Sequence, residues 1–217
     1  MVIHGFLLRC ALAASLAAIA THGDAQLPAG RSGFTSEREA SSREAWDALR
    51  YFGRCIAQGS RAASFQFLAT EPGSVDEVNV FNRLFTTGDV PCLDNMSRMS
   101  ASPRLVRGAI AEGLLLLNTP VPPQLVLAAP APGAPIRTMS EVARCYAVNH
   151  RAETRALVSG TRPASAEELA ALQHMEADVR RCVPPEAASV RFQPTELRYR
   201  LAEALLRLPP DAPAPHP

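Results

Sequence analysis

Apolar residues recur every three or four positions in several stretches of this chain, which is the spacing of amphipathic α-helices. Ala45, Leu49, Phe52 and Ile56 form one such stripe. Two further stripes follow: Val106, Ile110, Leu114 and Leu117, and later Leu197, Leu201, Leu205 and Leu208. A helix buries such a stripe against its neighbours, so the pattern predicts an all-α protein.

Local signals indicate where other helices begin. In a capping box, a Ser hydroxyl and a Glu carboxylate three residues later satisfy free amides at the helix start. Proline suits the first helical turn, because the amide it lacks has no acceptor there. Shorter helices are expected around 62–69 and 152–159. The starting signals occur at Ser74-x-x-Glu77, Pro103, Ser165-x-x-Glu168 and Pro194.

The predicted elements occur twice in the same order. The stretch around Arg54-Cys55 aligns with that around Arg144-Cys145, and the distance from Cys55 to Cys92 equals that from Cys145 to Cys182. We interpret this as an internal duplication into two tandem units of about four helices each, residues 41–118 and 137–208. A solenoid would need three or more shorter repeats.

The four cysteines of these units predict two disulfides. An even number of cysteines in an exported chain favours disulfides, and no close C-x-x-C pair suggests zinc. Of three pairings, the duplication favours Cys55–Cys92 with Cys145–Cys182. Each bond would join the end of a first helix to the residue after a third. No metal and no cofactor are expected.

The amino terminus predicts export. Residues 1–25 resemble a signal peptide, with an apolar run from Cys10 to Ala20 and small-residue cleavage sites after Ala20 and after Ala25. This run is shorter than the roughly 20 residues that span a bilayer, so no transmembrane segment is expected after cleavage. The predicted location is the periplasm or the medium.

Three segments lie outside the two units. Residues 26–40 read as a disordered polar lead-in and 209–217 as a disordered proline-rich tail. Residues 119–136 form a proline-rich linker, in which proline prevents a continuous helix. Its apolar piece Leu125-Val126-Leu127 suggests that part of the linker packs on a helical unit.

Charge argues against nucleic-acid binding. The 217 residues hold 22 basic side chains, all of them Arg, against 21 acidic ones, whereas a phosphate-binding surface needs a basic surplus. The apolar share of 47% with only 6% aromatic residues fits a helical globular protein.

Six charged residues recur at matching positions of the two units. The simplest hypothesis is a structural bond in which Glu112 or Glu203 meets Arg54 or Arg144 across helices. A second hypothesis makes the two glutamates an acid/base pair that cleaves glycosidic bonds, and a third makes the arginines an anion site. The recurring residues are Arg54, Arg107 and Glu112 in the first unit, and Arg144, Arg198 and Glu203 in the second.

The motifs that carry this duplication resemble those of a group of uncharacterised exported bacterial proteins. The shared pattern runs from Arg54-Cys55 through Pro72-Gly73-Ser74 and Cys92-Leu93 to the stretch 105–114, Leu-Val-Arg-Gly-Ala-Ile-Ala-Glu-Gly-Leu. The second unit keeps Arg144-Cys145 but not the Pro-Gly-Ser turn. The group has no assigned activity, so the resemblance implies only export and fold.

No hydrolase, zincin, P-loop or dinucleotide-binding motif occurs in the chain. We therefore expect a non-enzymatic exported module that binds another protein or an envelope component, and a homodimer is an open alternative. Two other functions stay open. One is a cell-envelope hydrolase that uses Glu112 and Glu203, and the other is a carrier of a small apolar ligand between the halves, with 118–136 as a lid.

Overall fold

A computed structural model describes residues 43–86, 92, 101–128 and 135–210. The described part of the chain contains eight α-helices and no β-strand, which confirms the predicted fold class. The first four helices are α1 (Arg43–Gly59), α2 (Arg61–Ala69), α3 (Val75–Thr86) and α4 (Pro103–Leu116), and the second four are α5 (Met139–Asn149), α6 (Arg151–Gly160), α7 (Ala166–Arg181) and α8 (Pro194–Leu206).

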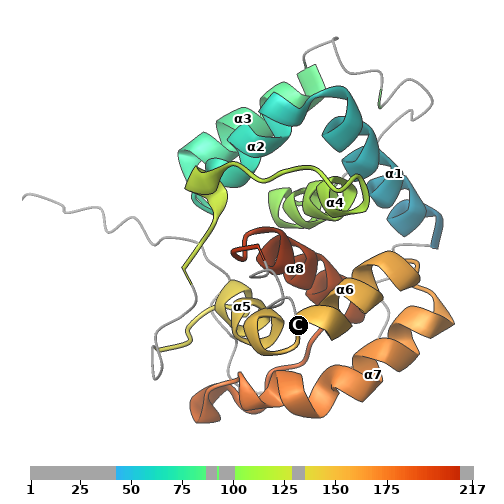
Figure 1. Cartoon of the computed structure of the whole chain (residues 1–217), viewed down its shortest axis with the longest axis vertical. Coiled ribbons are helices and arrows are strands. Elements are labelled where there is room, and N and C mark those ends of the chain that lie inside the picture. The colour runs from blue at the N-terminus through green and yellow to red at the C-terminus, as the bar shows by residue number, and fades with distance from the viewer. Residues whose placement is uncertain (1–42, 87–91, 93–100, 129–134, 211–217) are drawn as a thin grey trace, which may run out of the picture.

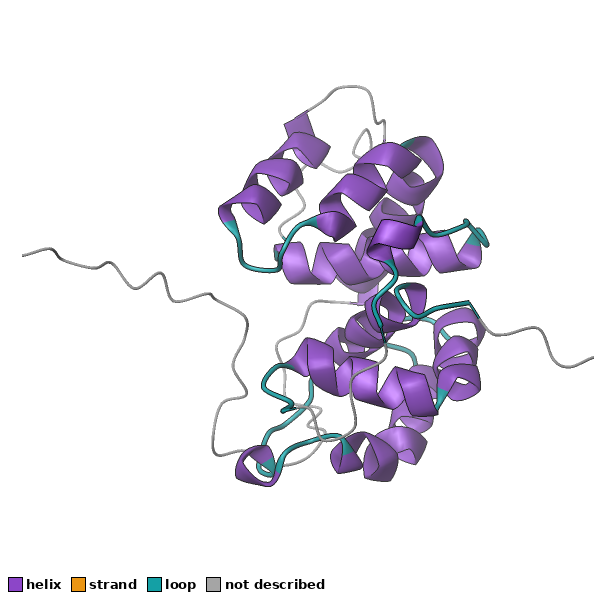
Figure 2. Cartoon of the chain, turned by 60° about the vertical axis from the view of Figure 1, so that its left-hand side comes forward, coloured by secondary structure: helices purple, strands orange, loops and turns teal. Residues whose placement is uncertain are grey.

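Helices α4 and α8 lie at the centre of the molecule (Figure 1). Helices α1, α2 and α3 cover α4 on one side, and α5, α6 and α7 cover α8 on the other, so the two groups are stacked (Figures 1 and 2). Helix α4 packs most extensively on α1 and next on α8. The last helix of each half therefore joins the halves.

The two halves have separate apolar clusters that meet through these central helices. Phe52, Phe67 and Ile110 lie in the first cluster, and Tyr146 and Leu201 lie in the second, all five fully or almost fully buried. Two residues of α8, Tyr199 and Leu206, belong to the first cluster, and Leu115 of α4 contacts both. The core is thus continuous across the boundary between the halves.

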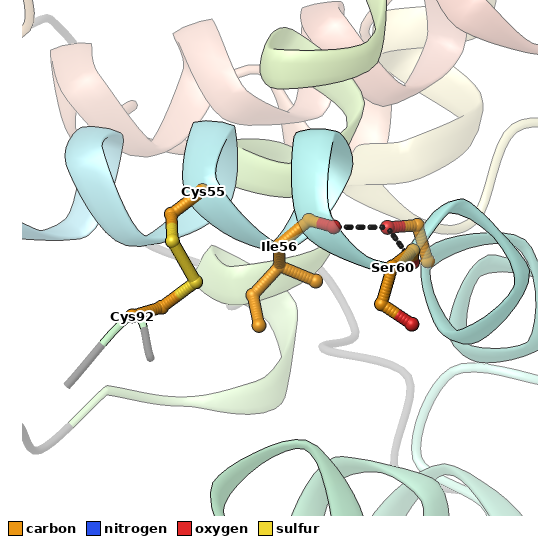
Figure 3. Close-up of a disulfide and its surroundings, with 5 residues drawn as sticks. Cys55, Ile56, Ser60 and Cys92 are labelled. Atoms are coloured by element: carbon orange, nitrogen blue, oxygen red, sulfur yellow. Dashed lines mark hydrogen bonds between the residues drawn. A yellow bond between two sulfur atoms is a disulfide. The ribbon is translucent and has the colours of Figure 1, made fainter. Parts of the chain in front are cut away.

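Each half contains one of the two predicted disulfides. Cys55 bonds to Cys92 and Cys145 bonds to Cys182, with Cα–Cα distances of 5.7 and 5.8 Å. Figure 3 shows the first bond leaving the side of α1 one residue before Ile56. One turn further on, the backbone amide of Ser60 donates to the Ile56 carbonyl at 2.9 Å, where α1 ends. The duplication itself stays a prediction from the sequence.

The capping residues begin α3 and α7 as expected, with one difference. Ser74 and Ser165 accept from the amides of Glu77 and Glu168 at 3.0 and 3.1 Å. Each carboxylate accepts from the amide one residue before the serine, at 2.7 and 2.6 Å, and not from the serine amide. The turn before the helix is therefore tied to it, and one carboxylate oxygen of each glutamate faces the interior.

The proline-rich linker packs on the helices, as its apolar residues suggested. A short 3₁₀ helix, η2 (Pro123–Leu125), places Leu125 in the first apolar cluster, where it is 2% exposed. The amide of Leu127 donates to the Arg207 carbonyl at 2.8 Å. A second 3₁₀ helix, η3 (Pro185–Ala187), connects α7 to α8.

Several predictions lie outside the described residues. These are the signal peptide with its two cleavage sites and Cys10, the lead-in 26–40, and residues 211–217 of the tail. Within the described ranges, no helix has both the length and the apolar character needed to cross a membrane.

Candidate functional site

Helices α4 and α8 approach so closely that position 108 has no room for a side chain. A Cβ at Gly108 would overlap with the backbone and Cβ of Tyr199. The Tyr199 ring is buried and lies 6.0 Å from the Trp46 ring of α1. Because of this close crossing, charged side chains of α4 can form hydrogen bonds with charged side chains of α8.

Arg107 of α4 is fully buried and links three elements. Its Nη2 and Nε donate to one oxygen of Glu203 on α8, at 2.7 and 3.1 Å. The same guanidinium donates to the carbonyls of Phe67, Leu68 and Thr70 at 3.0, 2.9 and 3.1 Å. The last carbonyls of a helix lack partners within it, so Arg107 caps α2 while it binds the opposite half.

Arg198 of α8 makes the matching set of contacts. It is fully buried, and its Nη2 and Nε donate to the two oxygens of Glu112 on α4, both at 3.0 Å. It also donates to the carbonyls of Leu157 and Val158, at 2.9 and 2.8 Å, and to the Thr161 hydroxyl at 2.6 Å. Two crossed ion pairs therefore join α4 to α8, and each arginine also caps a helix of its own half.

The capping glutamates of α3 and α7 stand next to these arginines. A Glu77 oxygen lies 3.4 Å from Arg107 Nη1, and a Glu168 oxygen lies 3.8 Å from Arg198 Nε. Burial raises the pKa of Glu168 above its ordinary value, although Arg198 opposes this shift.

A second arginine contacts each central carboxylate. Arg50 Nε donates to Glu112 at 2.9 Å, and Arg207 Nη1 donates to Glu203 at 3.3 Å. Burial alone would raise the pKa of Glu203, but Arg107 and then Arg207 lower it below its ordinary value. Glu203 is thus held as a carboxylate, which is unsuited to donating a proton.

The bonds differ from the partners expected from the sequence. Glu112 and Glu203 do bind arginines across helices, but these are not Arg54 and Arg144. Arg54 is exposed on α1, and Arg144 lies at a separate pocket between α5 and α8. The expected pairs do not form because α4 and α8 cross closely at Gly108. Each glutamate therefore binds an arginine of the other central helix, Arg107 or Arg198. The feature of the sequence that indicates the observed pairs is the presence of both an Arg and a Glu on the fourth helix of each unit.

A groove lies where the ends of α4 and α8 meet α6. It consists of two adjoining hollows of about 430 and 240 Å³ that share Leu115, Asn118, Arg155 and Leu205. The larger hollow is also lined by Leu114, Thr119, Pro120, Val121, Val126, Arg151, Leu206, Leu208 and Pro210, and the smaller by Leu116, Val158 and Ser159. Most of these side chains are apolar, and Arg155 of α6 reaches both hollows.

One more polar cluster involves a histidine. The Tyr146 hydroxyl donates to Glu153 at 2.6 Å, His150 Nδ1 lies 3.3 Å from the same carboxylate, and the Tyr146 and His150 rings stack at 4.5 Å. Burial and then Glu153 raise the pKa of Tyr146, so this phenol is unsuited to act as a base. Among the described residues, no three His, Cys, Asp or Glu side chains are grouped to hold a metal ion.

Comparison with known proteins gives no family for the chain. No family model, curated protein or solved structure matches it.

Proposed function

We propose that this protein is an exported binding module that holds a small amphiphilic molecule, with an apolar body and an anionic head, in the groove between α4, α6 and α8. The observation that carries this proposal is the groove itself. Sites for small molecules are concave, mostly apolar and roughly 300–1,000 Å³ in size, with a few polar groups that orient the ligand. The larger hollow of about 430 Å³ falls in this range.

The lining suggests which end of the ligand lies where. Leu114, Leu115, Leu205 and Leu206 line the larger hollow from the two central helices and would contact an apolar body. Arg155 is exposed on α6 and supplies a positive charge at the point where the hollows join. A carboxylate or sulfate head beside Arg155 would gain a charge-assisted hydrogen bond.

The linker supports a carrier function, because Thr119, Pro120, Val121 and Val126 form part of the lining. Leu125 of the same segment is buried in the core, so its deletion would disturb the fold. Point substitutions are therefore the better test of this segment.

The proposal also includes export from the cytosol. Two disulfides favour an oxidising compartment, since cytosolic thiols are kept reduced, and this agrees with the signal-like residues 1–25. The hydrolase hypothesis receives less support, because Glu112 and Glu203 each contact two arginines. An acid catalyst must carry a proton at working pH.

The test uses an anionic naphthalene dye whose fluorescence rises in apolar sites, with decanoate and decanol as competitors. We expect saturable dye binding that decanoate reverses better than decanol. Val126→Trp and Ser159→Trp would fill opposite ends of the groove and abolish binding. Val78→Trp is the matched control, because Val78 is 46% exposed on α3 and lies outside the groove lining.

Arg155→Gln tests the anionic head. It should reduce the preference for decanoate over decanol by about two- to fivefold, the size of one exposed ion pair. Arg162→Gln changes an exposed arginine that does not line the groove and serves as its control. Dye binding that survives both tryptophan substitutions would refute the groove as the site.

A further inference from the structure

Three arginines converge on a small pocket between α5 and α8, on a different face of α8 from the groove. Arg200 and Arg207 are seven residues apart, so about two helical turns place them on one face of α8, and Arg144 comes from α5. The pocket has a volume of about 80 Å³. Its lining is completed by Leu127, Ser140, Glu141, Glu203 and Ala204.

Two of these arginines have buried donors without partners. Arg200 is 5% exposed, and its Nη1 donates to the Ser140 hydroxyl at 2.9 Å. Its Nη2 lies 3.6 Å from the half-exposed carboxylate of Glu196. Arg200 Nε and Arg144 Nε are both buried, and neither has a hydrogen-bond partner among the described residues. Buried donors of this kind are rare in proteins and call for an acceptor.

The carboxylates of the pocket are already engaged. Glu203 accepts two hydrogen bonds from Arg107 on the side of the α4 crossing. Glu141 accepts from the backbone amides of Arg137 and Thr138, at 2.6 and 2.9 Å, where it caps α5. Arg207 Nη1 also donates to Glu203, at 3.3 Å, and Glu196 lies beside Arg200. Arg144 is the arginine of the pocket that has no ion pair with a carboxylate among the described residues, so its charge is available to a ligand.

At the equivalent position of the first half, α1 and α4 pack too closely to leave such a pocket. There α1 and α4 are in backbone contact, because a Cβ at Gly113 would lie 2.8 Å from the Arg54 Cα and a Cβ at Gly53 would overlap with Ala109. In the repeat alignment, Ala204 stands where the first half has Gly113, and Arg200 stands where it has Ala109. The second half thus has a larger residue at each of these two positions of α8, and one of them, Arg200, lines the pocket.

We propose that this pocket binds a small tetrahedral oxyanion, a phosphate or sulfate group. The three guanidinium groups and the Ser140 hydroxyl supply donors from several directions, which suits an anion with acceptor oxygens on all sides. The volume fits one such group and leaves no room for a large apolar body. This site is independent of the groove and of the function proposed for it.

The experiment measures phosphate binding to the full, disulfide-intact protein by calorimetry and phosphorus NMR, with chloride at equal ionic strength as the reference. Arg144→Gln should weaken phosphate binding roughly tenfold, the loss expected for a hydrogen bond to a charged group. Arg54→Gln is the matched control, because it removes the exposed arginine at the equivalent position of the first half. Ser140→Leu fills the pocket, keeps every arginine and should abolish binding.

Phosphate that gives no saturable signal beyond that of chloride would overturn the proposal, and so would equal binding by wild type, Arg144→Gln and Ser140→Leu. Binding of glycerol phosphate distinguishes a phosphate monoester from free phosphate as the ligand of the pocket. Its binding as well as that of phosphate supports a monoester head, whereas binding of phosphate alone supports the free ion. Ser159→Trp should keep phosphate binding even where dye binding is lost, so a failure of the groove proposal would not affect this one.

Discussion

Removal of Arg198 should destabilise the protein by about 4 kcal/mol, near the middle of the range for breaking a buried ion pair. Arg198→Met keeps the length of the side chain but deprives Glu112 of its two hydrogen bonds at 3.0 Å. The carbonyl of Val158 also loses its bond from Arg198, which adds about 1 kcal/mol, whereas the carbonyl of Leu157 still accepts from the Thr161 hydroxyl at 2.7 Å. Glu112 keeps its bond to Arg50, and this offsets part of the loss.

The same carboxylate offers a matched control. The Arg50 side chain is 24% exposed, whereas that of Arg198 is 0% exposed, although both bind Glu112. Arg50→Met should therefore cost no more than about 1 kcal/mol, as is typical of partly solvated pairs. The double variant Arg198→Met, Glu112→Leu removes the stranded charge. It should be less destabilised than the sum of its single changes by about 2 kcal/mol.

The assay is urea unfolding followed by circular dichroism, with the disulfides intact and at constant salt. Arg198→Lys should behave nearly like Arg198→Met, because an ammonium cannot reach both a bidentate carboxylate and the end of α6. Equal losses for Arg198→Met and Arg50→Met would refute the reasoning, since they would show that burial of the pair does not set its contribution.

Three further predictions concern the crossing of α4 and α8, the Cys145–Cys182 disulfide and the loss of stability at low pH. Gly108→Ala should lower the free energy of unfolding by about 1–3 kcal/mol, because the new methyl group overlaps with Tyr199; an unchanged urea midpoint would contradict this. Replacing Cys145 and Cys182 by Ser should cost about 3–4 kcal/mol in the chain-entropy model, measured by thermal unfolding against the oxidised wild type. The folded-state pKa of Glu203 is lowered, so its stabilising contribution is complete above the ordinary Glu pKa and is lost as pH falls through the folded value. Stability should therefore drop below about pH 4, and Glu203→Gln should flatten that drop.

The helices and disulfides were predictable because their causes are local or repeated. Apolar spacing marks the buried face of α4 and α8, serine and proline mark the helix starts, and equal cysteine spacing selects one pairing of three. The crossed ion pairs were not predictable in detail. Arg107 meets Glu203 across 96 positions of the chain, and no local pattern records which helices cross or at what distance.

The groove and the arginine pocket were less predictable, because they too depend on which helices lie side by side. Arg144 has a counterpart in the first half, Arg54, whereas Arg200 and Arg207 have none, so the repeated pattern of the sequence does not indicate them. Arg155 likewise has no counterpart, since the first half has Phe65 at the aligned position. The groove and the pocket to which we assign ligands are thus lined in part by residues that differ between the two halves.

The crossed pairs make the two halves depend on each other. Arg107 caps a helix of its own half but takes its closest carboxylate, Glu203, from the other, and Arg198 does the same with Glu112. A half without its partner would expose the central crossing and leave a buried arginine without its carboxylate, which is costly in an apolar interior. The groove is built from the ends of both central helices, so it exists only when the halves are joined. The interactions that hold the halves together thus also create the surface to which we assign ligand binding.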